Sequence, residues 1–190
     1  MIRTIVLYGD PVLRERGAKI SEVTDEIRTL ADDMIETMVD AEGVGLAAQQ
    51  IGKALQIAVV DVSHAEEPAT YIRVNGEDQQ LLDLMPLIFM NPTIERDGKR
   101  IADQEGCLSF PEIRAPITRP GAIKAKLTRL DGEEIELETD GLLARAIQHE
   151  TDHLNGILFI DRMSAAKKVS LRRTLKEMRK EGEAEARNRG

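Results

Sequence analysis

Two of the three histidines in this chain stand four positions apart, in the run His149-Glu150-Thr151-Asp152-His153. On a helix, side chains at this spacing project from one face, one turn above the other, so both imidazoles can reach the same cation. Glu150 lies beside them, where its carboxylate can touch a water molecule at the cation without being a ligand. The alternative is a helix with two incidental histidines, because the motif fixes only three positions. The spacing favours a metal site.

A catalytic metal site needs a third protein ligand and an open coordination position. One class of metalloprotease uses a third histidine six residues after the second, but Phe159 occupies that place here. Another class uses a glutamate from a later helix, and the nearest candidate, Glu177, lies among charged residues typical of a solvated helix. The remaining candidate is Cys107, which would complete a Cys-His-His set suited to a divalent metal. As the only cysteine it could also be an ordinary core residue.

The helix that must carry the two histidines is predicted over residues 141–154. Its apolar residues recur at helical spacing: Leu142, Leu143, Ala146, Ile147 and Leu154. Asp140 or Thr139 can cap its start, and Asn155-Gly156 suits its end.

Signals for strands and helices elsewhere do not alternate regularly. Thr24 can cap a helix predicted over residues 25–39. The other expected elements are a strand at 55–62, an exposed connection at 63–80 with a short strand at 71–74, a strand at 87–90 that ends at Asn91-Pro92, a hairpin over 123–137 that turns at Asp131-Gly132, and a helix from 164 to about 179. We therefore predict an α+β fold, with antiparallel strands and hairpins around a central metal-binding helix, an N-terminal helix and a C-terminal helix.

Length and composition set the general class of the protein. The 190 residues fit one catalytic domain, 1–190, in which residues 164–190 form a C-terminal helix and tail. The net charge of −8 argues against nucleic acid as the main partner, and no sequence-specific binding to it is expected. No apolar run is long enough for a membrane span or a secretory signal, so we expect a cytoplasmic protein without membrane contact.

Three segments together resemble the three motifs of bacterial peptide deformylases. They are Gly43-Val44-Gly45-Leu46-Ala47-Ala48-Gln49-Gln50-Ile51-Gly52, Glu105-Gly106-Cys107-Leu108-Ser109 and Gln148-His149-Glu150-Thr151-Asp152-His153. Their order and spacing also match, and the resemblance covers nearly the whole chain. It implies a hydrolase that removes the formyl group from the N-terminal formylmethionine of newly synthesised polypeptides and releases formate.

The resemblance also implies a ligand set and a metal. Cys107, His149 and His153 would hold Fe²⁺, for which Zn²⁺, Ni²⁺ or Co²⁺ can substitute. A divalent ion lowers the pKa of a bound water molecule toward about 7. Glu150 would accept the proton of that water and deliver it to the departing amine.

Further residues are implied to bind the substrate. The side-chain amide of Gln50 and the backbone N–H of Leu108 would stabilise the oxyanion. Val44 and Gly45 make sense if the substrate backbone adds as a strand along this loop, with Gly106 on the other side. An alternative for Gln50 is a turn residue that bonds nearby backbone.

The methionine side chain needs an apolar slot, which Leu142 and Ala146 could line with Val44. Ordinary core packing is the alternative for both. The family often has cysteine where this chain has Ala146, and an apolar residue where it has Arg145. The sequence therefore does not decide whether Arg145 makes this slot polar or points away from it.

Two arginines, Arg114 and Arg119, follow the cysteine motif. The resemblance implies that Arg114 meets the peptide or its carbonyl groups, and solvation at the surface is the alternative for both arginines. Glu105 could pair with one of them.

Residues 164–180 carry seven basic residues and one acidic residue, a net charge of +6 in an acidic chain. The resemblance implies docking near the ribosomal exit, and a plain solvated helix is the alternative. Two other functions also remain open. A zinc endopeptidase with a different third ligand would survive Cys107→Ser, and an inactive metal-binding, ribosome-associated module would tolerate Glu150→Ala.

Overall fold

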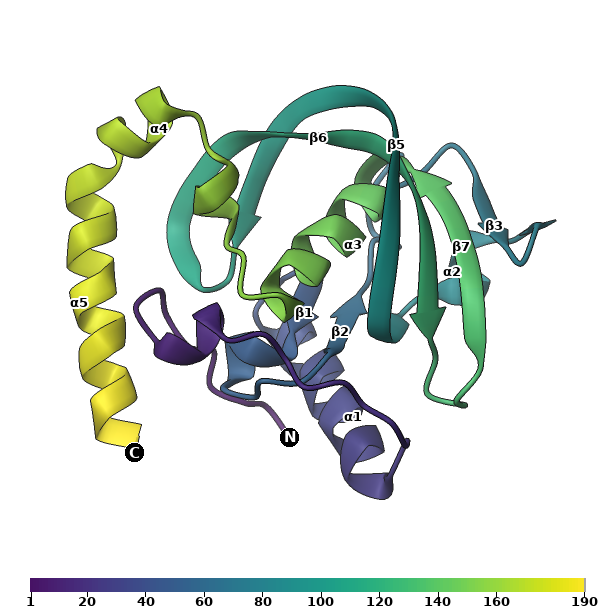
Figure 1. Ribbon diagram of the computed structural model, residues 1–190, viewed down its shortest axis with the longest axis horizontal. Helices are drawn as coiled ribbons and strands as arrows, with labels where there is room; N and C mark the ends of the chain where they lie inside the picture. The colour runs from purple at the N-terminus through teal and green to yellow at the C-terminus, as the bar shows by residue number, and fades with distance from the viewer. Residues whose placement is uncertain (190) are drawn as a thin grey trace.

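One long helix, α3 (Gly141–Leu154), lies inside the curve of a seven-stranded antiparallel sheet in the computed structural model, which describes residues 1–189 (Figure 1). The strands stand in the order β1 (Gly45–Ala47), β2 (Ile57–Val60), β5 (Leu87–Cys107), β6 (Phe110–Thr128), β7 (Glu134–Asp140), β3 (Ile72–Val74) and β4 (Glu77–Asp78). Helix α1 (Asp25–Asp40) packs on β1 and β2. The predicted α+β fold, with its central histidine-bearing helix, is confirmed.

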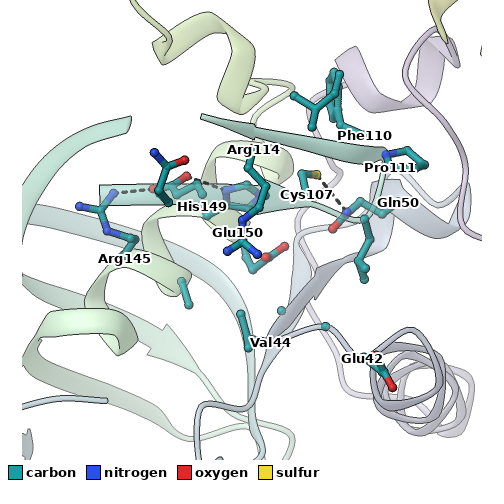
Figure 2. Close-up of a pocket in the computed structure, with 18 of the residues that line it drawn as sticks. Glu42, Val44, Gln50, Cys107, Phe110, Pro111, Arg114, Arg145, His149 and Glu150 are labelled. Carbon is teal, nitrogen blue, oxygen red and sulfur yellow. Dashed lines mark hydrogen bonds and ion pairs between the residues drawn. The ribbon is translucent and has the colours of Figure 1, made fainter. Parts of the chain in front are cut away.

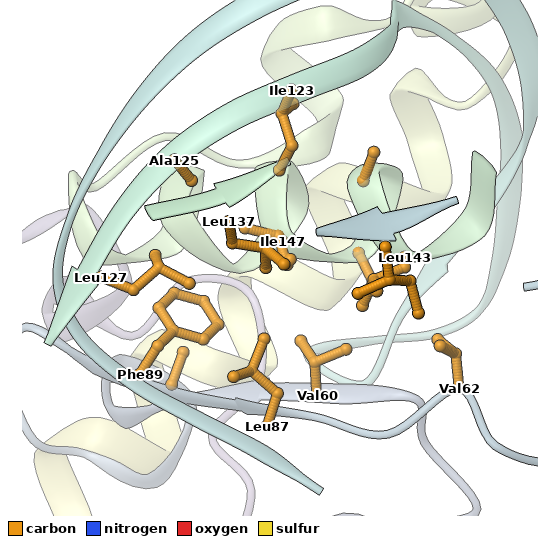
Figure 3. Close-up of a cluster of buried hydrophobic side chains, with 14 of the residues drawn as sticks. Val60, Val62, Leu87, Phe89, Ile123, Ala125, Leu127, Leu137, Leu143 and Ile147 are labelled. Carbon is orange, nitrogen blue, oxygen red and sulfur yellow. The ribbon is translucent and has the colours of Figure 1, made fainter. Parts of the chain in front are cut away.

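The main core lies between α3 and the sheet (Figure 3). Leu143 and Ile147 of the helix join Phe89, Leu127 and Leu137 of the sheet, and all of these side chains are fully buried. Each contributes about 1.5–3 kcal/mol by leaving water. The apolar spacing along residues 141–154 therefore marks the face that fixes the helix against the sheet.

The backbone N–H groups in the first turn of α3 find hydrogen-bond partners other than the predicted side-chain cap. Asp140 stands at the cap position, but its side chain accepts hydrogen bonds from the backbone N–H and the hydroxyl of Thr70. The free N–H of Leu143 instead donates to the carbonyl oxygen of Pro68 at 2.9 Å. The connection 63–80 thus closes the helix start, and it holds β3, which matches the predicted strand at 71–74, and β4.

The largest difference from the prediction is the hairpin of β5 and β6. The strand expected to end at Asn91-Pro92 continues to Cys107, and its register with β6 shifts between Met90 and Thr93. A bulge of this kind admits proline, which has no N–H to donate, and Asn91 takes a positive φ of 49° there. The hairpin arches over α3 and brings its end, with Cys107, to the helix (Figure 1).

Helix α1 lies within one residue of its predicted range, 25–39. The side chain of Thr24 accepts a hydrogen bond from the N–H of Ile27, as a cap should. The chain then turns into β1 and the short 3-10 helix η2 (Ala48–Ile51), which carries Gln50. The predicted strand at 55–62 is shorter, as β2, and the turn at Asp131-Gly132 joins β6 to β7 as predicted. The remaining short elements are η1 (Pro11–Arg14), α2 (Leu81–Leu84) and η3 (Phe159–Arg162).

The C-terminal segment forms two helices rather than one. Helix α4 (Ala165–Ser170) ends at Leu171, and α5 (Arg172–Arg189) continues ten residues beyond the predicted end near 179. The predicted apolar stripe of Leu171, Leu175 and Met178 packs against a second core cluster. No helix within residues 1–189 combines the length and the apolar character that crossing a membrane requires.

Candidate metal centre

Three side chains from two distant elements meet at the end of α3. The Cys107 sulfur and one ring nitrogen each of His149 and His153 all lie within 4.8 Å of one another. The Cys107 Sγ is 3.2 Å from Nε2 of His153. Glu177, the weaker candidate, is exposed and pairs with Arg173 on α5. The third ligand of this site is therefore the cysteine.

The surroundings of the imidazoles fit ligands of a divalent cation. Nδ1 of His149 donates to Oε2 of Glu105 at 3.0 Å, which leaves Nε2 of His149 for the metal. Burial lowers the pKa of His153 well below its ordinary value and keeps that ring neutral, as a ligand must be. Two imidazoles with one thiolate suit Fe²⁺, Co²⁺, Ni²⁺ and Zn²⁺.

Glu150 points its carboxyl group into a confined place beside the ligands. The residue is 4% exposed, and Oε2 has no hydrogen-bond partner within residues 1–189. A Cβ atom on Gly45 of β1 would lie only 2.4 Å from Oε1, so a larger residue there would displace the carboxyl group. Burial raises the pKa of Glu150 to about 7, although the charges of His149 and Arg119 oppose the rise. A carboxyl group of this pKa can accept and release a proton near neutral pH.

The side-chain amide of Gln50 has a fixed orientation. Its Oε1 accepts from the backbone N–H of Ala47 at 2.9 Å, and only an oxygen can face that donor. Its Nε2 therefore faces Cys107 Sγ at 3.5 Å and Ser109 Oγ at 3.4 Å. The two interpretations of Gln50 thus describe opposite ends of one amide, with the oxygen holding the turn and the nitrogen facing the ligands.

A cavity of about 670 Å³ opens over these groups (Figure 2). Its lining contains every predicted site residue except His153, which lies behind it: Val44, Gly45, Gln50, Gly106, Cys107, Leu108, Arg114, Leu142, Ala146, His149 and Glu150. The side chain of Arg114 extends over the cavity (Figure 2). Phe110, Ile113 and Glu42 also line it, and the motifs did not include them, although Glu42 and Phe110 directly flank two of the three.

A buried network of charges stands behind the ligands. Arg119 is only 2% exposed, and it donates to Glu105 at 2.6 and 3.0 Å and to Asp152 at 2.7 Å. The solvated alternative for Arg119 is therefore wrong, and the expected pairing of Glu105 is confirmed. Burial alone would raise the pKa of Glu105, but the hydrogen bonds from His149 and Arg119 prevail and hold it well below its ordinary value. Glu105 is thus a permanent anion beside a metal ligand.

Arg145, where the resemblance implies an apolar residue, belongs to the same network. It lines the cavity with its stem, and its guanidinium group donates to Glu105 Oε1 at 2.7 Å. Asp152, which binds Arg119, also accepts from Arg162 at 2.5 and 2.6 Å. The helical spacing could have pointed to Arg145, since it stands one turn before His149 on the same face.

Known proteins with this architecture share one activity in their names. A sequence model described as polypeptide deformylase matches residues 2–169. A peptide deformylase of Opitutus terrae is 45% identical over 178 residues, which cover 93% of this chain and 92% of the relative. A plant peptide deformylase structure has a TM-score of 0.81 at 33% identity and covers 96% of this chain and 92% of its own. A Synechococcus elongatus peptide deformylase, solved in complex with actinonin, has a TM-score of 0.75 at 35% identity, with 92% and 84% covered.

The match of the family model spans most of the chain, the relatives are similar along nearly their whole length, and the three metal ligands meet in one place. On these grounds the chain belongs to the polypeptide deformylase family.

Proposed function

We propose that the cavity hydrolyses the formamide bond of N-terminal formylmethionine in newly synthesised polypeptides, with the residues around Glu150 in the roles set out below. The chain removes this formyl group as a member of the deformylase family. The observation that carries the assignment of roles is the meeting of Cys107, His149 and His153 beside a buried carboxyl group at the base of an open cavity.

Cys107, His149 and His153 would hold the cation. When bound, a divalent ion supplies a Lewis acid that makes a water molecule nucleophilic near neutral pH. Mixed thiolate and imidazole ligands accept several metals. We assign Fe²⁺ as the metal used in the cell, in line with the family, and Zn²⁺, Ni²⁺ and Co²⁺ as substitutes.

Glu150 acts as the general base and then as the general acid. Its unpartnered Oε2 accepts the proton of the attacking water molecule, and the same atom then delivers that proton to the departing amine. Burial raises the pKa of Glu150 to about 7 in the metal-free site, and a neighbouring cation would lower that pKa, which favours the carboxylate form that accepts the proton.

Two donors serve the oxygen on which negative charge develops. Gln50 presents its Nε2 from the side of η2, and Leu108 presents its backbone N–H from the turn after β5. Donors fixed before the reaction stabilise such an oxyanion without reorganising. Gln50 is fixed in this way by its bond to Ala47.

The substrate backbone would lie along β1. This strand pairs with β2 alone within residues 1–189, so Val44 and Gly45 offer a free edge to an added strand, and Gly106 borders the opposite side. The apolar wall of Leu142 and Ala146 receives the methionine side chain. Arg114, which points over the cavity, reaches the carbonyl groups of the following residues.

The direct test is formate release from a formyl-Met peptide under anaerobic conditions with Fe²⁺, for the wild type and Glu150→Ala. We expect release by the wild type and a loss of at least about a hundredfold in the variant, with the metal retained. Equal release by both proteins would contradict the role of Glu150. A zinc endopeptidase would instead cleave internal bonds of an unformylated peptide, and a structural module would release no formate.

We also propose that the protein works in the cytoplasm and docks on the ribosome through the basic segment 164–180. Its apolar stripe faces the protein, so side chains such as Arg172, Lys176 and Lys180 remain exposed. Clustered positive charge on an acidic protein favours binding to RNA phosphates.

Co-sedimentation with ribosomes tests this docking. Changing Arg172, Lys176 and Lys180 to glutamate should abolish binding, and wild-type binding should weaken as salt concentration rises. The matched control changes the exposed Lys19, Lys53 and Lys99 to glutamate, which alters the net charge equally. Equal loss in both variants would show nonspecific attraction rather than docking.

A further inference from the structure

The metal ligands stand on two elements that are joined only distantly along the chain. Cys107 ends β5 in the long hairpin, whereas His149 and His153 lie on α3. Strand β6 packs on the core with alternate side chains, but much of β5 between Glu95 and Gln104 is exposed, so the core does little to fix the strand that ends in Cys107. The distance between the thiolate and the imidazoles therefore depends on specific ties between hairpin and helix.

Arg145 makes three such ties. It stands on α3 one turn before His149, and its side chain is buried. Its Nη1 donates to Glu105 Oε1 at 2.7 Å and to the carbonyl oxygen of Ile117 at 2.9 Å, and its Nη2 donates to the carbonyl oxygen of Ile101 at 2.8 Å. Ile101 and Glu105 belong to β5 and Ile117 to β6. One guanidinium group thus joins the histidine-bearing helix to both strands of the cysteine-bearing hairpin.

The bond to Glu105 also fixes the carboxylate that orients His149. Oε1 of Glu105 accepts from both Arg145 and Nε of Arg119, while Oε2 accepts from Nη2 of Arg119 and Nδ1 of His149. Because each oxygen accepts two hydrogen bonds, the orientation of the carboxylate is fixed. Glu105 also stands only two residues before Cys107, so the same group is tied to both ends of the ligand set.

We propose that Arg145 is a positioning residue that clamps the β5–β6 hairpin to α3 and thereby sets the affinity of the site for its metal. It donates to Glu105 and to two carbonyl groups rather than to a ligand atom, so its effect is transmitted through the elements that it joins. The inference rests on the metal site of the proposed function and not on the identity of the substrate.

Arg145 is a better position to test than Arg119. Removing Arg119 would leave buried carboxylates on both Glu105 and Asp152 short of a partner, which destabilises the whole fold. Removing Arg145 leaves Glu105 paired with Arg119. The carbonyl group of Ile101 is only partly buried, so water can replace the lost donor there.

The experiment titrates the metal-free protein with Co²⁺ against a competing chelator, without oxygen and without substrate. The dissociation constant and the thiolate-to-cobalt absorption band are recorded together. We expect Arg145→Leu to weaken Co²⁺ binding about ten- to a hundredfold and to shift the band, as changes beside metal ligands do. Arg145→Lys should lie between the leucine variant and the wild type, because one ammonium group reaches Glu105 but not both carbonyl groups as well.

The matched control is Arg100→Leu, which removes an exposed arginine with one carbonyl bond, to Thr118, from the same hairpin. Its dissociation constant and spectrum should equal those of the wild type. A folded Arg145→Leu protein with wild-type affinity and spectrum would overturn the proposal, as would equal weakening by Arg100→Leu. If Arg145→Leu does not fold, Arg145→Lys decides alone, and wild-type Co²⁺ affinity in that variant contradicts the clamp. Since no formyl peptide is used, the result stands even if formate release fails.

Discussion

The buried environment of Glu150 changes the acid strength of its carboxyl group. Oε2 of this carboxyl group has no hydrogen-bond partner within residues 1–189. Its pKa of about 7 lies above the ordinary value of 4.5. The folded metal-free protein therefore binds more protons than the unfolded chain between these two values. It should lose stability as pH rises through that window and recover it only when a cation neutralises the site.

A comparison of metal-free wild type with Glu150→Gln measures this effect. The glutamine does not titrate, so the variant should gain stability over the wild type as pH rises from 5 to 8, by roughly 3 kcal/mol at about 1.4 kcal/mol per pKa unit. Urea unfolding at both pH values gives the two free energies. The control is Glu177→Gln, at an exposed glutamate of α5. A difference in free energy of unfolding between Glu150→Gln and the wild type that stays constant with pH would count against a raised pKa.

Gln50 allows a test that preserves its structural bond. Gln50→Glu keeps an oxygen for the N–H of Ala47 but replaces the N–H donor that faces the cavity with a second oxygen. We expect kcat for formate release to fall about a hundred- to a thousandfold, with the metal content unchanged. Gln104→Glu, an exposed change on the cavity rim, should leave kcat close to wild type. A normal kcat in the Gln50 variant would remove it from the oxyanion site.

Among single residues, the sequence predicts those of the motifs but not the side chains that form hydrogen bonds and ion pairs behind them. His149, His153 and Glu150 stand within five positions, so one helical turn relates them. The partners of Glu105 lie 14, 40 and 44 positions away along the chain, at Arg119, Arg145 and His149. No local pattern encodes such contacts, which is why Arg119 could be taken for a solvated residue.

The elements show the same contrast between local and distant information. The helices at 25–39 and 141–154 and the turn at Asp131-Gly132 were predictable, because their periodicity or turn residues are local. The arch of β5 was not, because both of its faces are exposed between Glu95 and Gln104 and no alternation of apolar residues marks a strand. Asn91-Pro92 reads as a strand end unless the bulge that accommodates it is already known.

The contact between β1 and α3 gives a prediction for these two elements. Gly45→Ala would place a Cβ atom 2.4 Å from Oε1 of Glu150, so the carboxyl group must move. We expect kcat to fall at least tenfold while the dissociation constant for Co²⁺ stays unchanged, because no ligand is touched. In the Glu150→Gln background the same alanine should cost little further activity. If the losses of kcat from Gly45→Ala and Glu150→Gln were additive, Gly45 would not act through the carboxyl group of Glu150.

Over the whole molecule, the last helix is attached to the beginning of the chain. Helix α5 lies beside residues 7–9, where a Cβ atom on Gly182 would lie 2.3 Å from the carbonyl oxygen of Tyr8 and one on Gly9 would lie 2.1 Å from that of Arg179. Such close backbone contact depends on glycine in both segments. The composition of the chain indicates a basic C-terminal helix, but not the surface against which it is held.

Gly182→Val should therefore release α5 without disturbing the metal centre. We expect faster amide hydrogen exchange over residues 172–189 and unchanged formate release. Ala184→Val, at an exposed position of the same helix, is the matched control and should exchange like the wild type. Unchanged exchange in Gly182→Val would mean that the helix is held mainly by Leu175 and Met178.

Within residues 1–189 one side of β1 is unpaired, and the proposal that the substrate adds to it as a strand has a consequence for when the enzyme can act. An incoming chain can align there only while its first residues are extended and free of partners of their own. Once those residues have joined a helix or a sheet in their own protein, the formyl group is out of reach. The opportunity is thus brief and is set by the speed of translation and folding, so a protein that buries its start early must be processed while it is still being made.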